Sequence, residues 1–211
     1  MRRKEFAVQE LKDVEQFLQE TSYGYLSTIG EDGWPHLTPI NFVYLKGHIY
    51  FHGSRKGSKM TEIAAFNKVS FAVSKEYAII PSFFTDPERA CPATSYFKSV
   101  HIRGEAGPTE DLSEKAEVLS ALMAKLQPEG GYTPITPEDP LYRPELKGVS
   151  VVKLTIHEMT AKFKFGQNLN EQRREHMIHQ LSERGLPDDQ ETAELMRKYC
   201  PHHQELGQKG Q

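Results

Sequence analysis

One short segment limits the possible folds most strongly: a strand-like apolar run that leads through a basic, glycine-containing turn into a helical pattern. Residues 48–52 (HIYFH) form the run, residues 53–59 (GSRKGSK) form the turn, and a helical repeat follows at Met60, Ile63 and Ala64. Cations usually stand at helix C-termini, because the N-terminal end of the helix dipole is already positive. Cations gathered at an N-terminal end therefore indicate an anion site, and backbone amides, Ser hydroxyls and an Arg fork suit a phosphate. The alternative is a solvated turn that is basic without a ligand, and the spacing is not that of a Walker loop.

The remaining pattern predicts a mainly β chain with peripheral helices. We expect strands over residues 23–29, 36–44, 48–52, 69–74, 96–105 and 149–156, the last extending toward residue 165. We expect helices over residues 8–21, 56–65, 112–126, 169–184 and 189–199. The proline-rich residues 78–94 and 127–147 are expected to be irregular. Hairpin turns at residues 30–33 and 46–47 make the sheet antiparallel, which favours a small antiparallel barrel.

Composition and charge exclude several classes of protein. A chain of 211 residues can bury a sizeable core, and one domain with appendages is expected. The formal net charge of -3 argues against a broad nucleic-acid surface. The sequence shows neither a membrane-spanning apolar stretch nor a signal peptide, and Cys91 and Cys200 form no CxxC motif, so we expect a cytoplasmic protein.

Three motifs in order resemble a known family. Residues 49–59 (IYFHGSRKGSK), 65–73 (AFNKVSFAV) and 96–106 (YFKSVHIRGEA) resemble the FMN-binding split barrel of the pyridoxamine 5′-phosphate oxidase superfamily. Residues 39–42 (PINF) and Cys91 make the chain look most like the nitroimidazole-reductase-like branch. The resemblance covers roughly residues 10–160 and implies an antiparallel split β-barrel over residues 1–165. Residues 166–211 are then an α-helical C-terminal extension with a tail.

The resemblance also implies a cofactor, FMN, and the residues that would bind it. The FMN phosphate is expected at Ser54, Arg55, Lys56 and Lys59. The flavin ring is expected beside the strand that contains Thr38, Pro39, Ile40 and Asn41. Because proline cannot donate to a ladder, Pro39 predicts that this strand is at an edge or bulged, and a plain edge strand without a ligand is the alternative. His52 and Ser99 complete the predicted site, each with an ordinary strand position as its alternative.

The family's flavin sites lie at a dimer interface, so a homodimer is expected. Residues 163–165 (FKF) are then expected either to cover the partner's flavin or to be ordinary core and surface. Residues 162–168 (KFKFGQN) resemble FMN-binding negative regulators of the superfamily, whereas the Arg-Leu-His-Asp-Arg ending of the pyridoxamine oxidase is missing. This departure puts oxidation of pyridoxamine in doubt.

These observations lead to two main functional hypotheses. The first is an FMN-dependent oxidoreductase that passes electrons from a donor such as NAD(P)H to a small acceptor, with no catalytic acid or base assigned. The second is a non-catalytic flavin-binding regulator or sensor, and haem or deazaflavin are alternative cofactors. No metal site is expected, since the terminal group of Cys200, His202 and His203 lacks a further ligand at convincing spacing. His176 and His179 are expected to face water.

Overall fold

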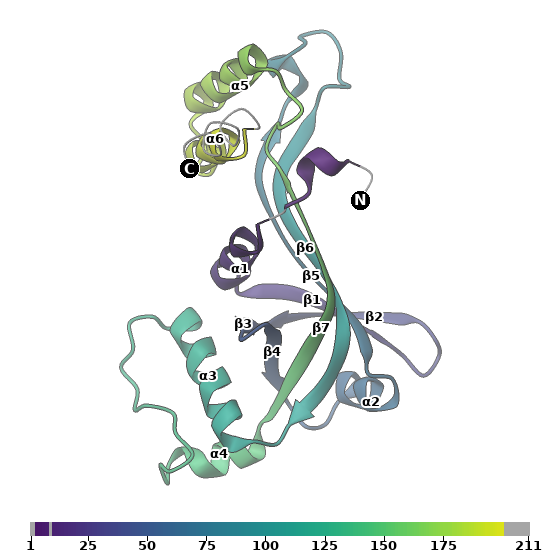
Figure 1. The fold of residues 1–211 in the computed structure, drawn as a ribbon, viewed down its shortest axis with the longest axis vertical. Coiled ribbons are helices and arrows are strands. Elements are labelled where there is room, and N and C mark those ends of the chain that lie inside the picture. The colour runs from purple at the N-terminus through teal and green to yellow at the C-terminus, as the bar shows by residue number, and fades with distance from the viewer. Residues whose placement is uncertain (1–2, 9, 201–211) are drawn as a thin grey trace, which may run out of the picture. The chain divides into compact units, whose positions relative to one another are not determined.

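A computed structural model describes residues 3–8 and 10–200 of the chain, and these residues form one seven-stranded sheet (Figure 1). The strands are β1 (Tyr23–Ile29), β2 (Pro35–Asn41), β3 (Val43–Leu45), β4 (His48–Gly53), β5 (Lys68–Ile80), β6 (Thr94–Thr109) and β7 (Ser150–Lys164). Their order across the sheet is β2-β1-β5-β6-β7-β4-β3. The β1–β2, β1–β5, β3–β4 and β4–β7 pairs are antiparallel. The predicted fold class, a mainly β antiparallel split barrel with peripheral helices, is confirmed.

Helices lie at the ends of the chain and between the strands. They are η1 (Lys4–Phe6), α1 (Leu11–Glu20), α2 (Ser58–Ala65), η2 (Ser82–Phe84), α3 (Leu112–Leu126), α4 (Tyr142–Gly148), α5 (Glu171–Arg184) and α6 (Asp189–Lys198). The expectation of irregular structure over residues 127–147 was wrong at its end, where α4 forms. Strand β5 also runs through Ile80, into a segment that the prolines had indicated to be irregular. None of the helices in the described ranges is long and apolar enough to cross a bilayer.

Two compact units share the long strands. Unit 1 contains residues 1–9, 74–99 and 161–211, and unit 2 contains residues 10–73 and 100–160. The division follows spatial contacts rather than chain order, because β5, β6 and β7 each pass from one unit into the other. The division into a barrel domain over residues 1–165 and an extension over residues 166–211 stays a prediction.

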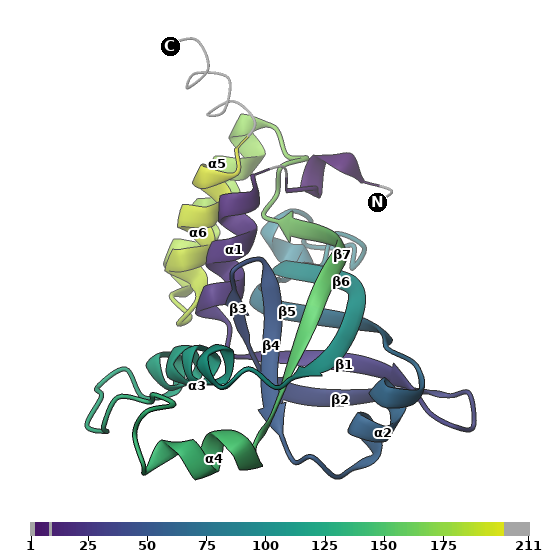
Figure 2. The same cartoon turned by 60° about the horizontal axis from the view of Figure 1, so that its bottom comes forward.

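Unit 2 is built around one face of the curled sheet. The inward side chains of β1 alternate with exposed ones, and the Phe42 and Phe71 rings meet edge to face at 5.0 Å between centroids. Helix α1 buries Val14, Phe17 and Leu18, which recur at helical spacing. Strand β2 lies beside β4, and α3 and α4 lie next to each other, as Figure 2 shows. The core therefore holds together the strand, turn and helix that carry the predicted phosphate site.

The tight turns of unit 2 have the geometry that their residues predict. Lys46 and Gly47 both have positive φ, 51° and 80°, as a two-residue turn with the mirror-image type I geometry requires. At the 30–33 turn, the Gly33 amide donates to the Gly30 carbonyl at 2.9 Å. Both predicted hairpin turns are confirmed.

Unit 1 has an aromatic core. Phe165 packs against Tyr77 and stacks on Tyr199, at centroid distances of 5.4 and 5.7 Å. Phe163 and Phe165 are 1% and 0% exposed, so the structure favours the core interpretation of residues 163–165. Helices α5 and α6 pack together (Figure 1), and Arg184 in α5 binds the buried Asp189 carboxylate through Nε at 2.9 Å.

Candidate functional site

The basic turn joins β4 to α2 as predicted, and a glycine makes the junction possible. Gly57 is the N-cap of α2 with φ of 143°, a conformation that side chains rarely adopt. Its carbonyl accepts hydrogen bonds from the Met60 and Thr61 amides, at 3.0 and 3.2 Å. Within the described residues, the Ser58 and Lys59 amides have no acceptor, and a glycine cap has no side chain to supply one. The start of α2 therefore offers two backbone donors to an anion.

Lys59 is the cation best placed to join these amides. It is half-buried, its Nζ lies 5.1 Å from the centroid of the Phe51 ring, and burial lowers the pKa of its ammonium group. Among the described residues no carboxylate lies within ion-pair distance of it. A partly desolvated ammonium without a counter-charge is destabilised until an anion binds beside it.

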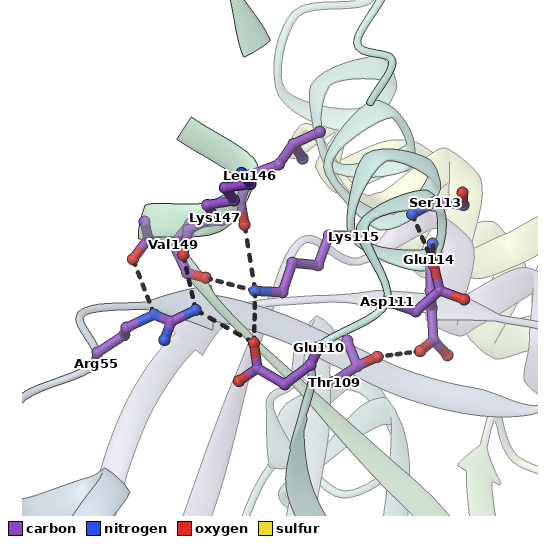
Figure 3. Close-up of polar contacts among 11 residues, drawn as sticks. Arg55, Thr109, Glu110, Asp111, Ser113, Glu114, Lys115, Leu146, Lys147 and Val149 are labelled. Carbon is purple, nitrogen blue, oxygen red and sulfur yellow. Dashed lines mark hydrogen bonds and ion pairs between the residues drawn. The ribbon is translucent and has the colours of Figure 1, made fainter. Parts of the chain in front are cut away.

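Arg55, in contrast, is held by helix α4 (Figure 3). Its Nη2 donates to the Lys147 carbonyl at 2.7 Å, and its Nε donates to the Gly148 carbonyl at 3.1 Å. Its Nη2 also lies 3.3 Å from a carboxylate oxygen of Glu110. A guanidinium at the C-terminal carbonyls of a helix is a favourable arrangement, because that end carries the negative partial charge. The residue that was expected to bind phosphate thus has three structural contacts, and its binding role stays a prediction.

A buried lysine completes the anchoring of α4. Lys115 in α3 is 1% exposed, and its Nζ donates to the Leu146 and Val149 carbonyls at 3.2 and 3.1 Å. It also lies 3.5 Å from Glu110, which therefore lies between the two cations Arg55 and Lys115 (Figure 3). Nothing in the sequence pattern indicated this group, because the prolines of residues 127–147 predicted irregular structure where α4 forms.

The other predicted phosphate residues are exposed. The Ser54 Oγ accepts a hydrogen bond from the Lys56 amide at 3.1 Å, which shapes the turn. His52 is exposed near the end of β4, opposite Val151 of β7. These positions are accessible to a ligand, and their binding roles stay predictions.

Strand β2 is an edge strand without a bulge. Its pairing with β1 runs without interruption from Asn41 opposite Tyr23 to Pro35 opposite Ile29, with Pro39 opposite Tyr25. Of the two interpretations of Pro39, the structure therefore selects the edge strand. Thr38 is half-buried and Ile40 is 8% exposed on the inner face.

The outer face of β2 carries the other two predicted ring-binding residues. Pro39 and Asn41 are both exposed, and the Asn41 Nδ2 donates to the Ser22 carbonyl at 3.0 Å. This bond links the end of β2 to the residue before β1, and it uses one of the donors of the Asn41 amide. The remaining amide groups of Asn41 and the outer backbone edge of β2 are the parts of this strand that can meet a ligand.

A carboxylate ties β2 to α2, and sequence reasoning missed it. Glu62 in α2 is 5% exposed, and it accepts a hydrogen bond from the Thr28 hydroxyl while it lies 2.7 Å from Nδ1 of His36. The bonds from Thr28 and His36 lower the pKa of Glu62, and the bond to Glu62 raises the pKa of His36. The sequence signal that could have identified Glu62 is its position on the buried side of the α2 helical repeat.

Unit 2 contains all the predicted site residues except Ser99, and whether they form one site stays a prediction. Ser99 belongs to unit 1, where its hydroxyl lies 3.5 Å from the Lys162 carbonyl, at the limit of a hydrogen bond. The described residues contain no group of three metal-binding side chains, and His202 and His203 lie outside them.

The fold and the basic turn agree with a comparison of the sequence with protein families. Residues 10–163 match the pyridoxamine 5′-phosphate oxidase family, and the chain therefore belongs to this family. A curated relative, "Protease synthase and sporulation protein PAI 2" of Bacillus subtilis (strain 168), is 28% identical over 92% of this chain and 94% of its own length.

Solved structures show the same fold. A putative 5-nitroimidazole antibiotic resistance protein from Bacteroides thetaiotaomicron superposes with a TM-score of 0.59 and 20% identity, over 74% of this chain and 85% of its own. The flavocytochrome Anf3 from Azotobacter vinelandii gives a TM-score of 0.63 and 24% identity, over 76% of this chain and 70% of its own. At these identities the likeness concerns the fold alone.

Proposed function

We propose that this protein is an FMN-binding oxidoreductase that passes electrons between a donor such as NAD(P)H and a small acceptor. Membership of the pyridoxamine 5′-phosphate oxidase family supports the cofactor class. The observation that carries the proposal is the start of α2, where two backbone amides and the half-buried Lys59 have no acceptor or carboxylate partner in the described part of the chain. This arrangement fits a phosphate monoester.

Each part of the candidate site would have a separate role. The Ser58 and Lys59 amides, the Lys59 ammonium and the exposed Ser54 and Lys56 would hold the phosphate. The outer edge of β2 near Asn41 would orient the ring through backbone and amide groups. Bound FMN supplies the redox chemistry, and the protein supplies binding, orientation and the electrostatic surroundings.

The names of structural neighbours support a flavin-type cofactor and suggest a class of acceptor. One neighbour is described as a flavocytochrome, and another as the FAD and heme binding protein from Mycobacterium smegmatis, with a TM-score of 0.61. The nitroimidazole resistance protein suggests nitro-aromatic compounds as acceptors to test. We propose FMN because the donors at the start of α2 suit one phosphate monoester.

An absorption spectrum of the purified protein tests this function. We expect a flavin spectrum, release of FMN on denaturation as identified by mass spectrometry, and bleaching of the flavin when NADPH or NADH is added without oxygen. Haem would instead give a Soret band. A protein that holds no flavin after incubation with FMN would contradict the proposal, and bound flavin that no donor reduces would contradict the electron-transfer part alone.

We further propose a homodimer with the flavin at its interface. One face of the β1–β2 ribbon is exposed and apolar: Tyr23, Tyr25 and Ile29 of β1 lie on the same side as Leu37 and Pro39 of β2. Leu37 is 65% exposed, and the adjoining Trp34 is 71% exposed. An apolar patch of this kind on a sheet edge is typical of a protein–protein interface. The predicted ring-binding strand forms part of the same face.

A cytoplasmic location also remains a proposal. Cys91 and Cys200 are both free thiols, and Cys91 is exposed. Free exposed thiols are typical of a reducing compartment. Cell fractionation followed by detection of the protein would test this location.

A flavin-binding regulator is the second candidate. It is suggested by the relative named "Protease synthase and sporulation protein PAI 2", whose similarity extends over 92% of this chain. Salt-dependent binding of duplex DNA by the purified protein would favour this function. Rapid turnover with a nicotinamide donor and no DNA binding would favour the oxidoreductase.

A further inference from the structure

Unit 1 contains a large cavity that the proposed flavin site does not use. Its volume is about 950 Å³, and its walls come from η1, the segment after β5, the adjoining ends of β6 and β7, and the start of α5. A bridge between Ala7 and Lys162 holds the N-terminal segment beside β7. The predicted flavin-site residues, from Thr38 to Ser99, are absent from its lining. The cavity therefore needs an explanation of its own.

The lining is strongly cationic. It contains five cationic side chains and one carboxylate: Arg3, Arg89, Lys162, Lys164 and Arg173, with Asp86. Two of the cations already have a carboxylate beside them: the Asp86 Oδ2 lies 2.6 Å from Nε of Arg89, and Arg3 lies 3.9 Å from Glu5. Lys162, Lys164 and Arg173 carry the remaining positive charge. Lys164 donates to the Thr94 hydroxyl, and its pKa is lowered by burial and by the nearby charges of Lys162 and Arg3. In a chain with a net charge of -3, this local excess of positive charge is unfavourable unless an anion offsets it.

Helix α5 adds further positive potential. Its first turn enters the cavity wall at Gln172 and Arg173, and the N-terminal end of a helix of 14 residues carries positive partial charge. Behind this wall, Arg174 is only 3% exposed and donates through Nη2 to the Leu169 carbonyl at 2.9 Å. Its Nε is buried with no hydrogen-bond partner among the described residues. This guanidinium is therefore not fully satisfied, although it is not itself part of the cavity lining.

The rest of the lining mixes polar side chains, such as Thr85, Asn168 and Gln172, with apolar and aromatic ones. Phe6, Tyr96 and Met177 line it, and Phe6 and Tyr96 are 2% and 3% exposed. Burial raises the pKa of Tyr96 to about 12, so its hydroxyl stays neutral at physiological pH. His176 is exposed, as expected, and it also lines the cavity, with its Nε2 2.9 Å from the Phe84 carbonyl. An inorganic ion would fill only a small part of a cavity of this volume.

We propose that the cavity in unit 1 binds a phosphorylated small organic molecule of the nucleotide class, at a site separate from the flavin. The cations Lys162, Lys164 and Arg173 supply several charges, which suits a dianionic phosphate better than a single carboxylate. The volume of about 950 Å³ is at the upper end of the range for ligand pockets, which suits a ligand of nucleotide size. The organic part of the ligand would lie beside the aromatic and apolar side chains of the lining.

Calorimetric titration of the full-length protein tests this proposal. Adenosine 5′-monophosphate (AMP), pyrophosphate and adenosine are titrated into the protein with and without saturating FMN. We expect AMP to bind in both cases, and adenosine to bind at least about tenfold more weakly, because it lacks the charge that the cations recognise. AMP affinity should fall as salt is raised.

Substitutions identify the site. Lys164→Gln and Arg173→Gln should each weaken AMP binding about tenfold while FMN affinity is unchanged. Arg197→Gln is the matched control, because Arg197 is an exposed arginine on α6 of the same unit and lies outside the cavity. Circular dichroism establishes that each variant is folded. The proposal is overturned if neither AMP nor pyrophosphate binds, if binding is indifferent to both substitutions, or if AMP displaces FMN from a single shared site.

Discussion

Arg55 and Lys59 are four residues apart in one basic turn, and their surroundings give them different roles. Arg55 donates to the C-terminal carbonyls of α4 and pairs with Glu110, whereas Lys59 lies over Phe51 with no carboxylate beside it among the described residues. A sequence motif treats both as phosphate ligands. The difference matters because a cation that already has partners must lose them to bind an anion.

We expect Arg55→Ala to lower the free energy of unfolding by about 1 kcal/mol, because α4 loses its capping donor at a half-exposed position. Urea denaturation measures this change. Arg103→Ala is the control, because its pair with Glu158 is exposed at 3.5 Å and should contribute little. Unchanged stability together with weaker FMN binding would show instead that Arg55 serves the ligand.

We expect Lys59→Met to weaken FMN binding by roughly 1.5–3 kcal/mol, because one charge-assisted contact to the phosphate is lost while the apolar stem is kept. Fluorescence titration with FMN measures the affinity. Lys46→Met is the control, since Lys46 is 67% exposed and pairs with Glu117 at 2.6 Å. Equal FMN affinities of the two variants would show that the phosphate does not bind at the start of α2.

The His36–Glu62 pair should make stability depend on pH. The raised pKa of His36 gives stability that is complete below its ordinary value of 6.5 and is lost as pH rises through the raised value. The lowered pKa of Glu62 gives stability that is complete above 4.5 and is lost as pH falls through the lowered value. The contribution should therefore be largest between pH 4.5 and 6.5, and His36→Gln should abolish the decline on the alkaline side. Thermal unfolding of both proteins across this range tests it, and identical profiles would contradict it.

At the scale of elements, helix α4 shows how a proline can mislead. Pro144 is the third residue of α4, in the first turn, where the missing amide would have no helical acceptor. The proline content of residues 127–147 predicted irregular structure, yet a short helix forms and its carbonyls receive Arg55 and Lys115. Its stability comes from these tertiary partners rather than from local preference.

Helix α3 is joined to the sheet by one carboxylate, and this link is testable. Glu114 accepts hydrogen bonds from Thr109, from Tyr50 at 2.8 Å and from Lys153 at 3.1 Å, and these bonds bring its pKa to about 2. We expect Glu114→Gln to lower the free energy of unfolding at pH 7 by roughly 1–3 kcal/mol. The difference from the unsubstituted protein should shrink as pH falls from 4.5 toward 2, where Glu114 itself becomes protonated. Urea denaturation at several pH values measures both effects, and a constant difference would contradict this account.

At the scale of the whole molecule, the apolar face of β1–β2 predicts self-association. Leu37→Glu should shift a dimer toward monomer, because it places a charge on this face at a position where the single chain leaves the side chain 65% exposed. Sedimentation velocity measures the change. Leu141→Glu is the matched control, at 63% exposure on the N-terminal side of α4. A dimer unaffected by Leu37→Glu would place the interface elsewhere.

The sequence alone determined the features that depend on neighbouring residues. Hydrophobic periodicity predicted α1, α2, α3, α5 and α6 and most of the strands, and turn residues predicted the hairpins at Gly30 and Lys46. The expectation of one strand over residues 36–44 was wrong, because the chain breaks at Phe42 into β2 and β3, which lie at opposite ends of the strand order. Family motifs predicted the split barrel and the strand–turn–helix junction at Gly57. These features follow from local backbone preferences and from the period of side-chain burial.

Only the tertiary structure decided which charges have partners. Arg55 meets carbonyls 92 and 93 residues further along the chain, and Glu62 meets His36 from another element. The cationic cavity is assembled from residues between Arg3 and Met177 that no local pattern connects. The reason is physical: an electrostatic interaction depends on distance in space and on desolvation, and both are set by packing rather than by position in the sequence.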